Sequence, residues 1–334
     1  MRSLITIMNR FTPFTHRPGL PMLLPGTSYL VEAFPTLLKI STNHKSYHLS
    51  FSLTGPIEGF TTLQNQEKDR IEIFGRAKEG FFLFYLQEIN GSLRLILRRG
   101  VEVKGEIDDA PFSLTHKDSL EIAVGRSLAL KKQERLSFGC HKKLDFAKVE
   151  NRFELQELLP LLFFLGQKYP FTKEVLPLKE EREFKEAIQL YFNHLLVPEL
   201  EDKKFLGLTR RALPEKTSKE EILASMASSI RALFFRESEE EIYLLPELWS
   251  SLPSGRFIGI ESSWGEFALD WTKHKLRRLH FTATKDGLLT INWPKEIVSY
   301  RLKRHLKEKG VVKERGEKLL VKAGTTYLLD RFEK

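Results

Sequence analysis

The sequence predicts an α+β protein that is mainly β, with an N-terminal antiparallel β-sandwich, a short helical middle and a C-terminal antiparallel β-sandwich. Short β-rich segments separated by turns fill two stretches, about 29–135 and 241 onwards. Between them, apolar residues recur at helical spacing. A chain of 334 residues is too long for one ordinary domain, so we expect domains at residues 1–140, 141–240 and 241–334.

The N-terminal third begins with residues 1–25, which are rich in proline and turn residues and predict an extended lead-in. Asn90-Gly91 supplies the positive φ angles of a two-residue hairpin turn. Strands that follow one another without helices favour an antiparallel sandwich or barrel, of which we expect the sandwich. The expected strands lie in SYHLSFSL, RIEIFG, GFFLFYLQEI, SLRLILRRG, VEVKGEI and LEIAVG.

The middle of the chain changes to a helical period near Lys142. Pro160 should kink or divide the first helical segment, because proline lacks the N–H that the helix needs. About 100 residues here predict three or four helices, in DFAKVENRFELQELLPLLFFLGQ, LKEEREFKEAIQLYFNHLLVPEL and TSKEEILASMASSIRALFF.

The last third is β-rich again. In Glu266–Trp271, Phe267, Leu269 and Trp271 face one way and the alternate residues face the other, which predicts a half-buried strand. The expected strands lie in EIYLLPEL, RFIGIESS, EFALDW, RRLHFTAT, LLTINW, IVSYRLKR, KLLVKA and TTYLLD.

Cysteine usage and hydropathy indicate a cytoplasmic protein without a membrane span. Cys140 is the single cysteine, which excludes an intramolecular disulfide and a CxxC metal site and fits a reducing compartment. The short apolar run at residues 4–8 falls below the ~7–15 residues of a secretory signal. The most apolar run, residues 158–166, is shorter than the ~20 residues of a membrane helix.

Charge is unevenly distributed along the chain. The net charge is +9, but residues 271–334 contain 17 Lys and Arg against 7 Asp and Glu. Such a basic region suits nucleic acid, an anionic surface or an acidic partner, and the basic run Arg301–Gly310 is the candidate for binding nucleic-acid phosphate. The alternative is a solvated sheet face whose lysines discourage aggregation at the sheet edge.

One stretch resembles a known family. Four short motifs follow one another in this stretch: Leu244-Leu245-Pro246, Pro253-Ser254-Gly255, a strand reaching Gly259-Ile260, and Glu266-Phe267 running to Trp271. Together with the helix ILASMASSIRALFF and the ending Leu319–Asp330, these motifs resemble the barrel end and C-terminal β-domain of family-95 glycoside hydrolases, the α-L-fucosidase-like enzymes. The resemblance covers about residues 221–330 and departs at Trp264-Gly265, where the family order is Gly-Phe.

The resemblance implies a β-sandwich, a helical (α/α)6 barrel and a C-terminal β-domain in that order. The catalytic carboxyl and amide groups of the family sit in the barrel, which takes several hundred residues, whereas this chain has about 100 there. We therefore carry over no catalytic residue. The resemblance implies a shared scaffold with the barrel reduced to a few helices.

Candidate ligand-binding residues lie beside this stretch. Glycoside hydrolysis needs two carboxylates about 5–10 Å apart. Glu266 and Asp270 share a strand face about 13 Å apart, so Glu261 and Glu266 would need partners from elsewhere, the alternative being solvated carboxylates on a sheet face. Trp264 lies between two strands beside Gly265, where a large ring is often exposed, and is the best contact for a sugar ring, whereas Trp271 is expected in the core.

Other chemistry has little support in the sequence. Cys140, His141 and Asp145 lie close together, but adjacent residues on a strand point to opposite faces, so the Cys-His pair would not meet. The chain contains none of GxxxxGK[ST], GxGxxG, HExxH or GxSxG, and no paired metal-ligand spacing. We therefore predict neither a cofactor nor a metal site.

Three functional hypotheses remain. The first is a non-catalytic carbohydrate-binding or accessory protein that holds a sugar between the β-domains and the helices. The second is an interaction protein whose basic C-terminal domain binds an acidic partner or nucleic acid. The third, the least supported, is an active glycoside hydrolase with a rebuilt site.

Overall fold

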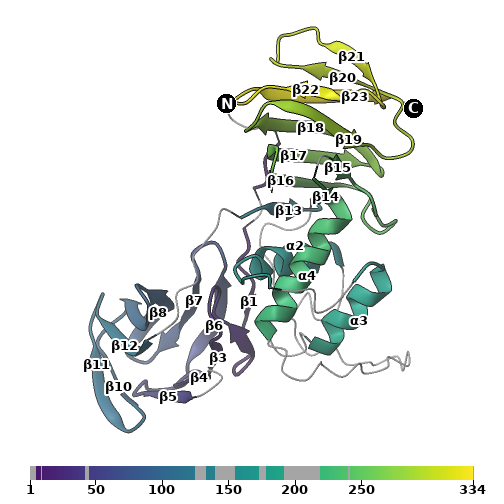
Figure 1. The fold of residues 1–334 in the computed structure, drawn as a ribbon. Coiled ribbons are helices and arrows are strands. Elements are labelled where there is room, and N and C mark those ends of the chain that lie inside the picture. Colours follow the sequence, from purple (N-terminus) through teal and green to yellow (C-terminus); the bar gives the residue numbers. More distant parts are fainter. Residues whose placement is uncertain are drawn as a thin grey trace.

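A computed structural model describes residues 5–8, 10–41, 45–124, 133–139, 155–172, 178–191, 219–239 and 241–333. Of these residues, 49% lie in strands and 14% in helices, which confirms the mainly β prediction. Two β-domains occupy the ends of the molecule, and three helices lie beside the first domain and against the first strands of the second (Figure 1).

The N-terminal β-domain consists of two six-stranded antiparallel sheets. The first sheet has the order β1-β6-β7-β8-β9-β12, with β1 (Phe14–Thr15), β6 (Glu58–Asn65), β7 (Arg70–Ala77), β8 (Gly80–Ile89), β9 (Ser92–Arg99) and β12 (Ser119–Val124). The second has the order β11-β10-β5-β4-β3-β2, with β11 (Ala110–Leu114), β10 (Val103–Ile107), β5 (Ser46–Phe51), β4 (Leu37–Ser41), β3 (Leu30–Ala33) and β2 (Pro21–Leu23).

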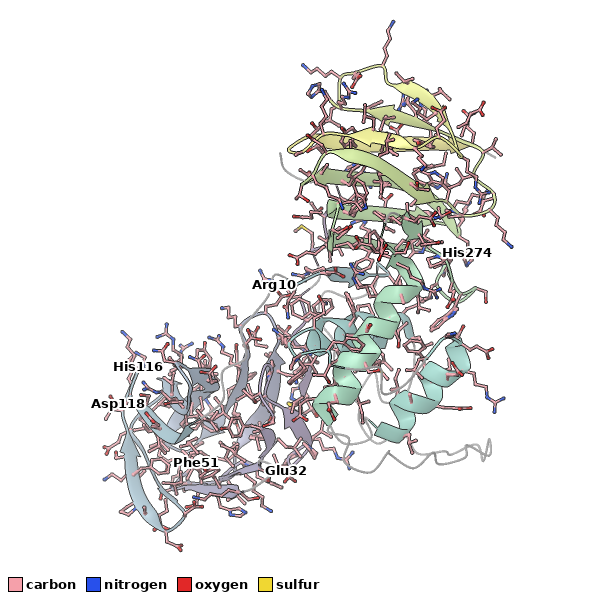
Figure 2. All side chains as sticks on the ribbon, in the orientation of Figure 1. Arg10, Glu32, Phe51, His116, Asp118 and His274 are labelled. Carbon is pink, nitrogen blue, oxygen red and sulfur yellow. The ribbon has the colours of Figure 1, made fainter. Side chains whose placement is uncertain are left out.

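Alternating sequence patterns build this sandwich as expected. In β7, and in β9 as far as Leu97, every second residue is buried. Asn90 and Gly91, with φ angles of 52° and 84°, form the predicted two-residue turn between β8 and β9. Phe51 of the second sheet stacks on Phe84 of the first at 5.0 Å, and Figure 2 shows Phe51 among the side chains of the domain interior.

Three helices form the described part of the middle region: α2 (Leu155–Gly166), α3 (Glu181–Tyr191) and α4 (Lys219–Phe234). Pro160 does not divide the first of them, which runs unbroken from Leu155 to Gly166. Nearly every side chain of α2 is buried, so tertiary packing stabilises the helix against the missing hydrogen bond.

The C-terminal β-domain consists of a seven-stranded and a four-stranded sheet. Phe235 of the smaller sheet packs on Phe267 of the larger, 5.4 Å apart. The larger has the order β13-β16-β17-β18-β23-β20-β21, with β13 (Arg135–Ser137), β16 (Gly255–Ser262), β17 (Gly265–Thr272), β18 (Lys275–Ala283), β23 (Thr326–Glu333), β20 (Ser299–Lys303) and β21 (Val311–Glu314). The smaller has the order β14-β15-β19-β22, with β14 (Phe235–Glu237), β15 (Glu241–Leu244), β19 (Gly287–Asn292) and β22 (Leu319–Val321).

Three features of this domain differ from the sequence prediction. The pairing of β15 with β19 is parallel, because three strands of the larger sheet intervene between them in the chain. Strand β13, placed in the N-terminal domain by the predicted boundary at 140, pairs with β16. Strand β14, placed in the helical middle, pairs with β15. The second β-domain thus takes strands from both sides of the helices.

Strand β17 is buried on both faces rather than half-buried. Ala268 and Asp270, predicted to face solvent, are 7% and 8% exposed. Arg278 on the neighbouring strand forms an ion pair with Asp270 and lies across it. The period-2 pattern identifies the core face of β17 correctly, but on the outer face the long Arg278 side chain covers Asp270.

The N-terminal domain is joined to the helices through the end of α2. The buried Lys168 ammonium forms an ion pair with Asp69, in the turn between β6 and β7. The buried Tyr169 hydroxyl donates to the Thr27 carbonyl at 3.0 Å. These two bonds place the chain segment after α2 against the first β-domain.

None of the helices in the described part of the chain has the length and apolar character needed to cross a bilayer.

Candidate functional site

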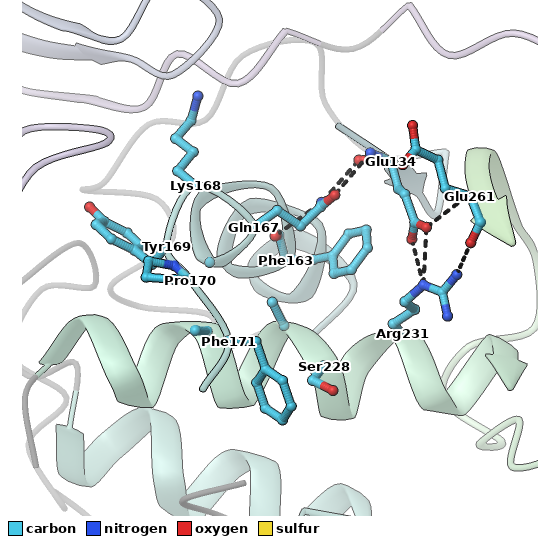
Figure 3. Close-up of a pocket in the computed structure, with 13 residues that line it drawn as sticks. Glu134, Phe163, Gln167, Lys168, Tyr169, Pro170, Phe171, Ser228, Arg231 and Glu261 are labelled. Atoms are coloured by element: carbon cyan, nitrogen blue, oxygen red, sulfur yellow. Dashed lines mark hydrogen bonds and ion pairs between the residues drawn. The ribbon is translucent and has the colours of Figure 1, made fainter. Parts of the chain in front are cut away.

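A cavity of about 550 Å³ lies where the helices meet the second β-domain (Figure 3). Its walls come from the end of α2 and the residues after it, from one face of α4, from Glu134 just before β13, and from Glu261 of β16. The lining residues are Glu134, Phe163, Gly166, Gln167, Lys168, Tyr169, Pro170, Phe171, Ala224, Ala227, Ser228, Arg231 and Glu261.

Small residues shape the floor of this cleft. A Cβ atom at Gly166 would lie 2.3 Å from the Leu223 carbonyl oxygen and 2.8 Å from Ala227 Cβ. Glycine therefore allows α2 to approach α4 closely, and Ala224 and Ala227 leave room beside the contact. The apolar floor follows from the same sequence pattern that packs the two helices.

A buried ion pair closes one end of the cleft. Glu134 is 7% exposed, and Arg231 Nε lies 3.0 and 2.9 Å from its two carboxylate oxygens. The backbone N–H of Glu261 donates to the same carboxylate at 2.9 Å, and Arg231 Nη2 donates to the Glu261 carbonyl at 2.6 Å. These bonds join the segment before β13, helix α4 and strand β16.

The Gln167 side chain holds the backbone of Glu134 in the same network. Its amide oxygen accepts the Glu134 N–H at 2.9 Å, and its amide nitrogen donates to the Glu134 carbonyl at 3.0 Å. Figure 3 shows Glu134 between Gln167 and Arg231, with each bond dashed. Three chain segments therefore position the Glu134 carboxylate.

Burial raises the pKa of the Glu134 carboxyl above its ordinary value, although Arg231 acts in the opposite direction. A raised pKa in a cleft is one signature of a general acid. Here, however, the carboxylate oxygens are occupied by Arg231 and by the Glu261 N–H. The geometry is that of a positioned ion pair.

The open part of the cleft carries groups free to bind a ligand. The Phe171 ring is 52% exposed, and the Ser228 side chain is exposed on α4. The carboxylate of Glu261 points away from Arg231 in Figure 3, and within the described part of the chain it has no hydrogen-bond partner. An aromatic ring, a hydroxyl and one carboxylate thus surround an apolar floor.

The structure brings two of the sequence candidates together. Glu261 on β16 and Glu266 on β17 are directly opposite each other in the antiparallel pairing, and both are exposed. Glu261 lines the cleft, whereas Glu266 does not. The partner that reaches Glu261 from elsewhere is Glu134, which lies 127 positions earlier in the chain.

The expectation that Trp264 is exposed is wrong. Its ring is 6% exposed, with the Lys285 ammonium 4.0 Å from the ring centroid. A Cβ atom at Gly287 would lie 3.1 Å from the same ring, so the ring packs tightly against β19. The side chain folds back from its turn onto the smaller sheet, and it does not line the cleft.

Asp270 and Trp271 do not line the cleft. Asp270 pairs with Arg278, and Trp271 is 1% exposed, which confirms its expected core position. Cys140, His141 and Asp145 lie outside the described residues. Within the described ranges, no three His, Cys, Asp or Glu side chains are grouped so that they could hold a metal ion.

Sequence reasoning missed five contributors to the cleft: Glu134, Gln167, Phe171, Ser228 and Arg231. Arg231 carries a signal, because a charged residue in the apolar run SIRALFF requires a partner when the helix packs. Phe171 and Gln167 carry none, since they follow a helix whose end is set by packing. Glu134 stands among other charged residues and resembles a surface position.

No protein-family model matches the chain, and no curated protein gives a significant match.

Proposed function

We propose that the chain is a non-catalytic carbohydrate-binding or accessory protein on a reduced glycoside-hydrolase-like scaffold, with the sugar held in the cleft between α2, α4 and β16. The resemblance of residues 221–330 to the barrel end and C-terminal domain of family-95 glycoside hydrolases suggested this class. The cleft occupies the place where the helices meet the C-terminal β-domain.

One observation carries the proposal. The exposed Phe171 ring and the unpartnered Glu261 carboxylate line the same cavity of about 550 Å³, within the residues that the structure describes. Sugar rings present C–H faces that pack on aromatic rings and hydroxyl groups that donate to carboxylates. Ser228 adds a hydroxyl, and the apolar floor excludes water from the rest of the ligand.

The same geometry favours binding over hydrolysis. Cleavage of a glycosidic bond needs two carboxyl groups that both reach the bond. Glu261 supplies one, but Glu134 is held by Arg231 and by the Glu261 N–H. A carboxylate in this position stabilises the wall of the cleft.

A glycan array that includes fucosylated and galactosylated oligosaccharides, followed by calorimetry with the best binder, tests the proposal. Phe171→Ala should weaken binding about tenfold, because it removes the stacking surface. Glu261→Gln should weaken it through the loss of a charged acceptor. Phe81→Ala, which removes a 37% exposed ring from the N-terminal domain, is the matched control and should bind as the wild type does.

Two results would contradict this function. The first is the absence of glycan binding, or binding that Phe171→Ala leaves unchanged. The second is release of the chromophore from chromogenic fucosides or galactosides in a reaction that Glu261→Gln abolishes, which would make the chain an enzyme. A cytoplasmic location belongs to the same proposal, and cell fractionation tests it.

A further inference from the structure

The far end of the second β-domain carries an exposed basic hairpin, defined here as residues 299–314, which comprise β20, β21 and the loop between them. Strand β21 is the last strand of the seven-stranded sheet and pairs with β20. In Figure 1 the hairpin lies at the end of the molecule away from the helices, and Figure 2 shows nitrogen-tipped side chains extending from it.

Three large aliphatic side chains of the hairpin project into solvent. Leu306 is 56% exposed, Val311 58% and Val312 67%. Isolated exposed aliphatic residues are ordinary on a protein surface, but these lie within seven positions of one another on a single hairpin. Val311 and Val312 are consecutive residues of the edge strand β21, so their side chains lie on its two faces, and Leu306 lies in the loop between β20 and β21.

Cations lie among these aliphatic residues, and some of them form no ion pair within the described residues. Arg301 and Lys303 pair with Asp330, and Lys313 pairs with Glu317. Within the described ranges, the exposed side chains of the other three cations form no ion pair. These are Arg304, Lys307 and Lys309.

The loop that carries these cations is held in place. The Glu308 carboxylate accepts the backbone N–H groups of Arg304 and His305 at 2.6 and 3.3 Å. Gly310 adopts a φ of 82°, and a Cβ atom there would lie 2.7 Å from the Leu302 carbonyl oxygen. The loop is therefore preorganised, which lowers the entropic cost of binding a partner.

The outer edge of β21 offers limited backbone pairing. The Arg315 N–H donates to the Val298 carbonyl. By the alternation of an antiparallel pair, the backbone N–H and C=O groups of Val311 and Lys313 also point towards β20, while those of Val312 and Glu314 point away from the sheet. The Glu317 carboxylate accepts the Glu314 N–H at 3.0 Å, which leaves Val312 to offer backbone groups to a partner. Side chains must therefore supply most of the recognition.

We propose that the basic hairpin docks an acidic polypeptide segment that carries aliphatic side chains, with Arg304, Lys307 and Lys309 facing its carboxylates and Leu306, Val311 and Val312 its apolar groups. Charge complementarity selects the occupant. A second copy of the chain would bring like charges together. Nucleic acid would satisfy the cations but leave the exposed Leu306, Val311 and Val312 side chains without apolar partners, and no exposed aromatic ring of Phe, Tyr or Trp lies in the hairpin for bases to stack on.

Fluorescence anisotropy with a labelled short peptide that alternates Glu and Leu tests this docking. The full chain should bind it, and the affinity should fall steeply between about 0.05 M and about 0.5 M salt, because exposed charges are screened. Lys307→Glu should weaken binding about tenfold and Val312→Ser about threefold. Lys104→Glu is the matched control, since it makes the same charge change at a 71% exposed side chain of the N-terminal domain.

The outcomes separate the alternatives. Loss confined to the hairpin variants supports the proposal. Absence of peptide binding overturns it, and so does an equal loss in Lys104→Glu, which would indicate attraction to net charge alone. Tighter binding of a single-stranded oligonucleotide, unaffected by Val312→Ser, would instead assign the hairpin to nucleic acid. Phe171→Ala should leave peptide binding unchanged, so failure here is independent of the cleft.

Discussion

Trp271 explains why the Pro253-Ser254-Gly255 turn ends in glycine. A Cβ atom at Gly255 would lie 2.3 Å from the Trp271 ring, directly across the β16–β17 pair. The indole N–H donates to the Leu252 carbonyl at 3.0 Å, and the ring stacks on Phe234 at 5.2 Å. The turn, the tryptophan and the end of α4 therefore form one packing unit.

His280 is the residue through which we expect pH to affect the stability of the fold. It is 8% exposed on β18, near Arg278, Asp270 and Asp330, and burial lowers its pKa below the ordinary value of 6.5. Below pH 6.5 the imidazole of His280 binds a proton in the unfolded chain, whereas burial disfavours its protonation in the folded chain. The contribution of His280 to stability is therefore present above pH 6.5 and is lost as pH falls.

We expect the free energy of unfolding to decrease from about pH 7 to about pH 5, and His280→Gln to make this decrease shallower. Urea unfolding at several pH values measures the slope. His116→Gln, at an exposed position of the N-terminal domain, is the control and should keep the wild-type slope. An unchanged slope in His280→Gln would show that this group does not couple to folding.

At the level of elements, the contact between α2 and α4 determines whether the cleft exists. The contact depends on Gly166, because any side chain there meets the backbone of α4 at Leu223. The apolar faces of both helices are fully buried around it. A single methyl group at this position forces the helices apart.

Gly166→Val should lower the free energy of unfolding by about 2 kcal/mol, because overpacking a close helix contact strains both helices. Chemical denaturation followed by circular dichroism measures the change. Gly316→Val is the matched control, since a Cβ atom there meets nothing within 4 Å. Equal stability of the two variants would show that the helices separate without cost.

Aromatic ladders provide the corresponding rigidity in the second β-domain. Phe267, Phe281 and Tyr327 are direct partners on β17, β18 and β23. Their rings stack at 4.9 and 4.8 Å. Cross-strand aromatic pairs of this kind stabilise a sheet and define its register. Strand β16, which carries Glu261, pairs with β17, so this wall of the cleft belongs to the same rigid sheet.

At the scale of the whole molecule, the junction with the N-terminal domain combines polar contacts with the packing of Phe11 on Phe164, whose rings lie 4.8 Å apart. Besides Lys168–Asp69 and Tyr169–Thr27, Arg135 of β13 pairs with Glu67 at 2.9 Å. The Arg135 guanidinium also lies over the rings of Phe11 and Phe164. The tryptophans, at positions 249, 264, 271 and 293, all lie after the helices, so their fluorescence does not report on the first domain.

Lys168→Glu should place two carboxylates at the junction and loosen the N-terminal domain. We expect the unfolding transition followed by circular dichroism to shift to lower denaturant further than the one followed by tryptophan fluorescence. Lys185→Glu, which reverses a charge on the 42% exposed side chain of the α3 ion pair, is the control. Parallel shifts of both probes in Lys168→Glu would mean that the two domains unfold as one unit.

Much of the β architecture was predictable from the sequence because the relevant physics is local. Period-2 patterns located the strands of both domains, Asn90-Gly91 specified its hairpin, and the inward phase of Trp271 predicted its burial. The exposed cations of the basic hairpin also follow from sequence, because composition alone concentrates charge there.

Tertiary structure alone decided the site. The sequence does not indicate that Glu134 meets Arg231, that β13 joins the second domain or that Trp264 is covered by Lys285. Each of these depends on a contact between residues far apart in the chain or on the conformation of a turn. Local patterns specify which face of an element is apolar, whereas the neighbour that covers it is set by how all the elements pack together.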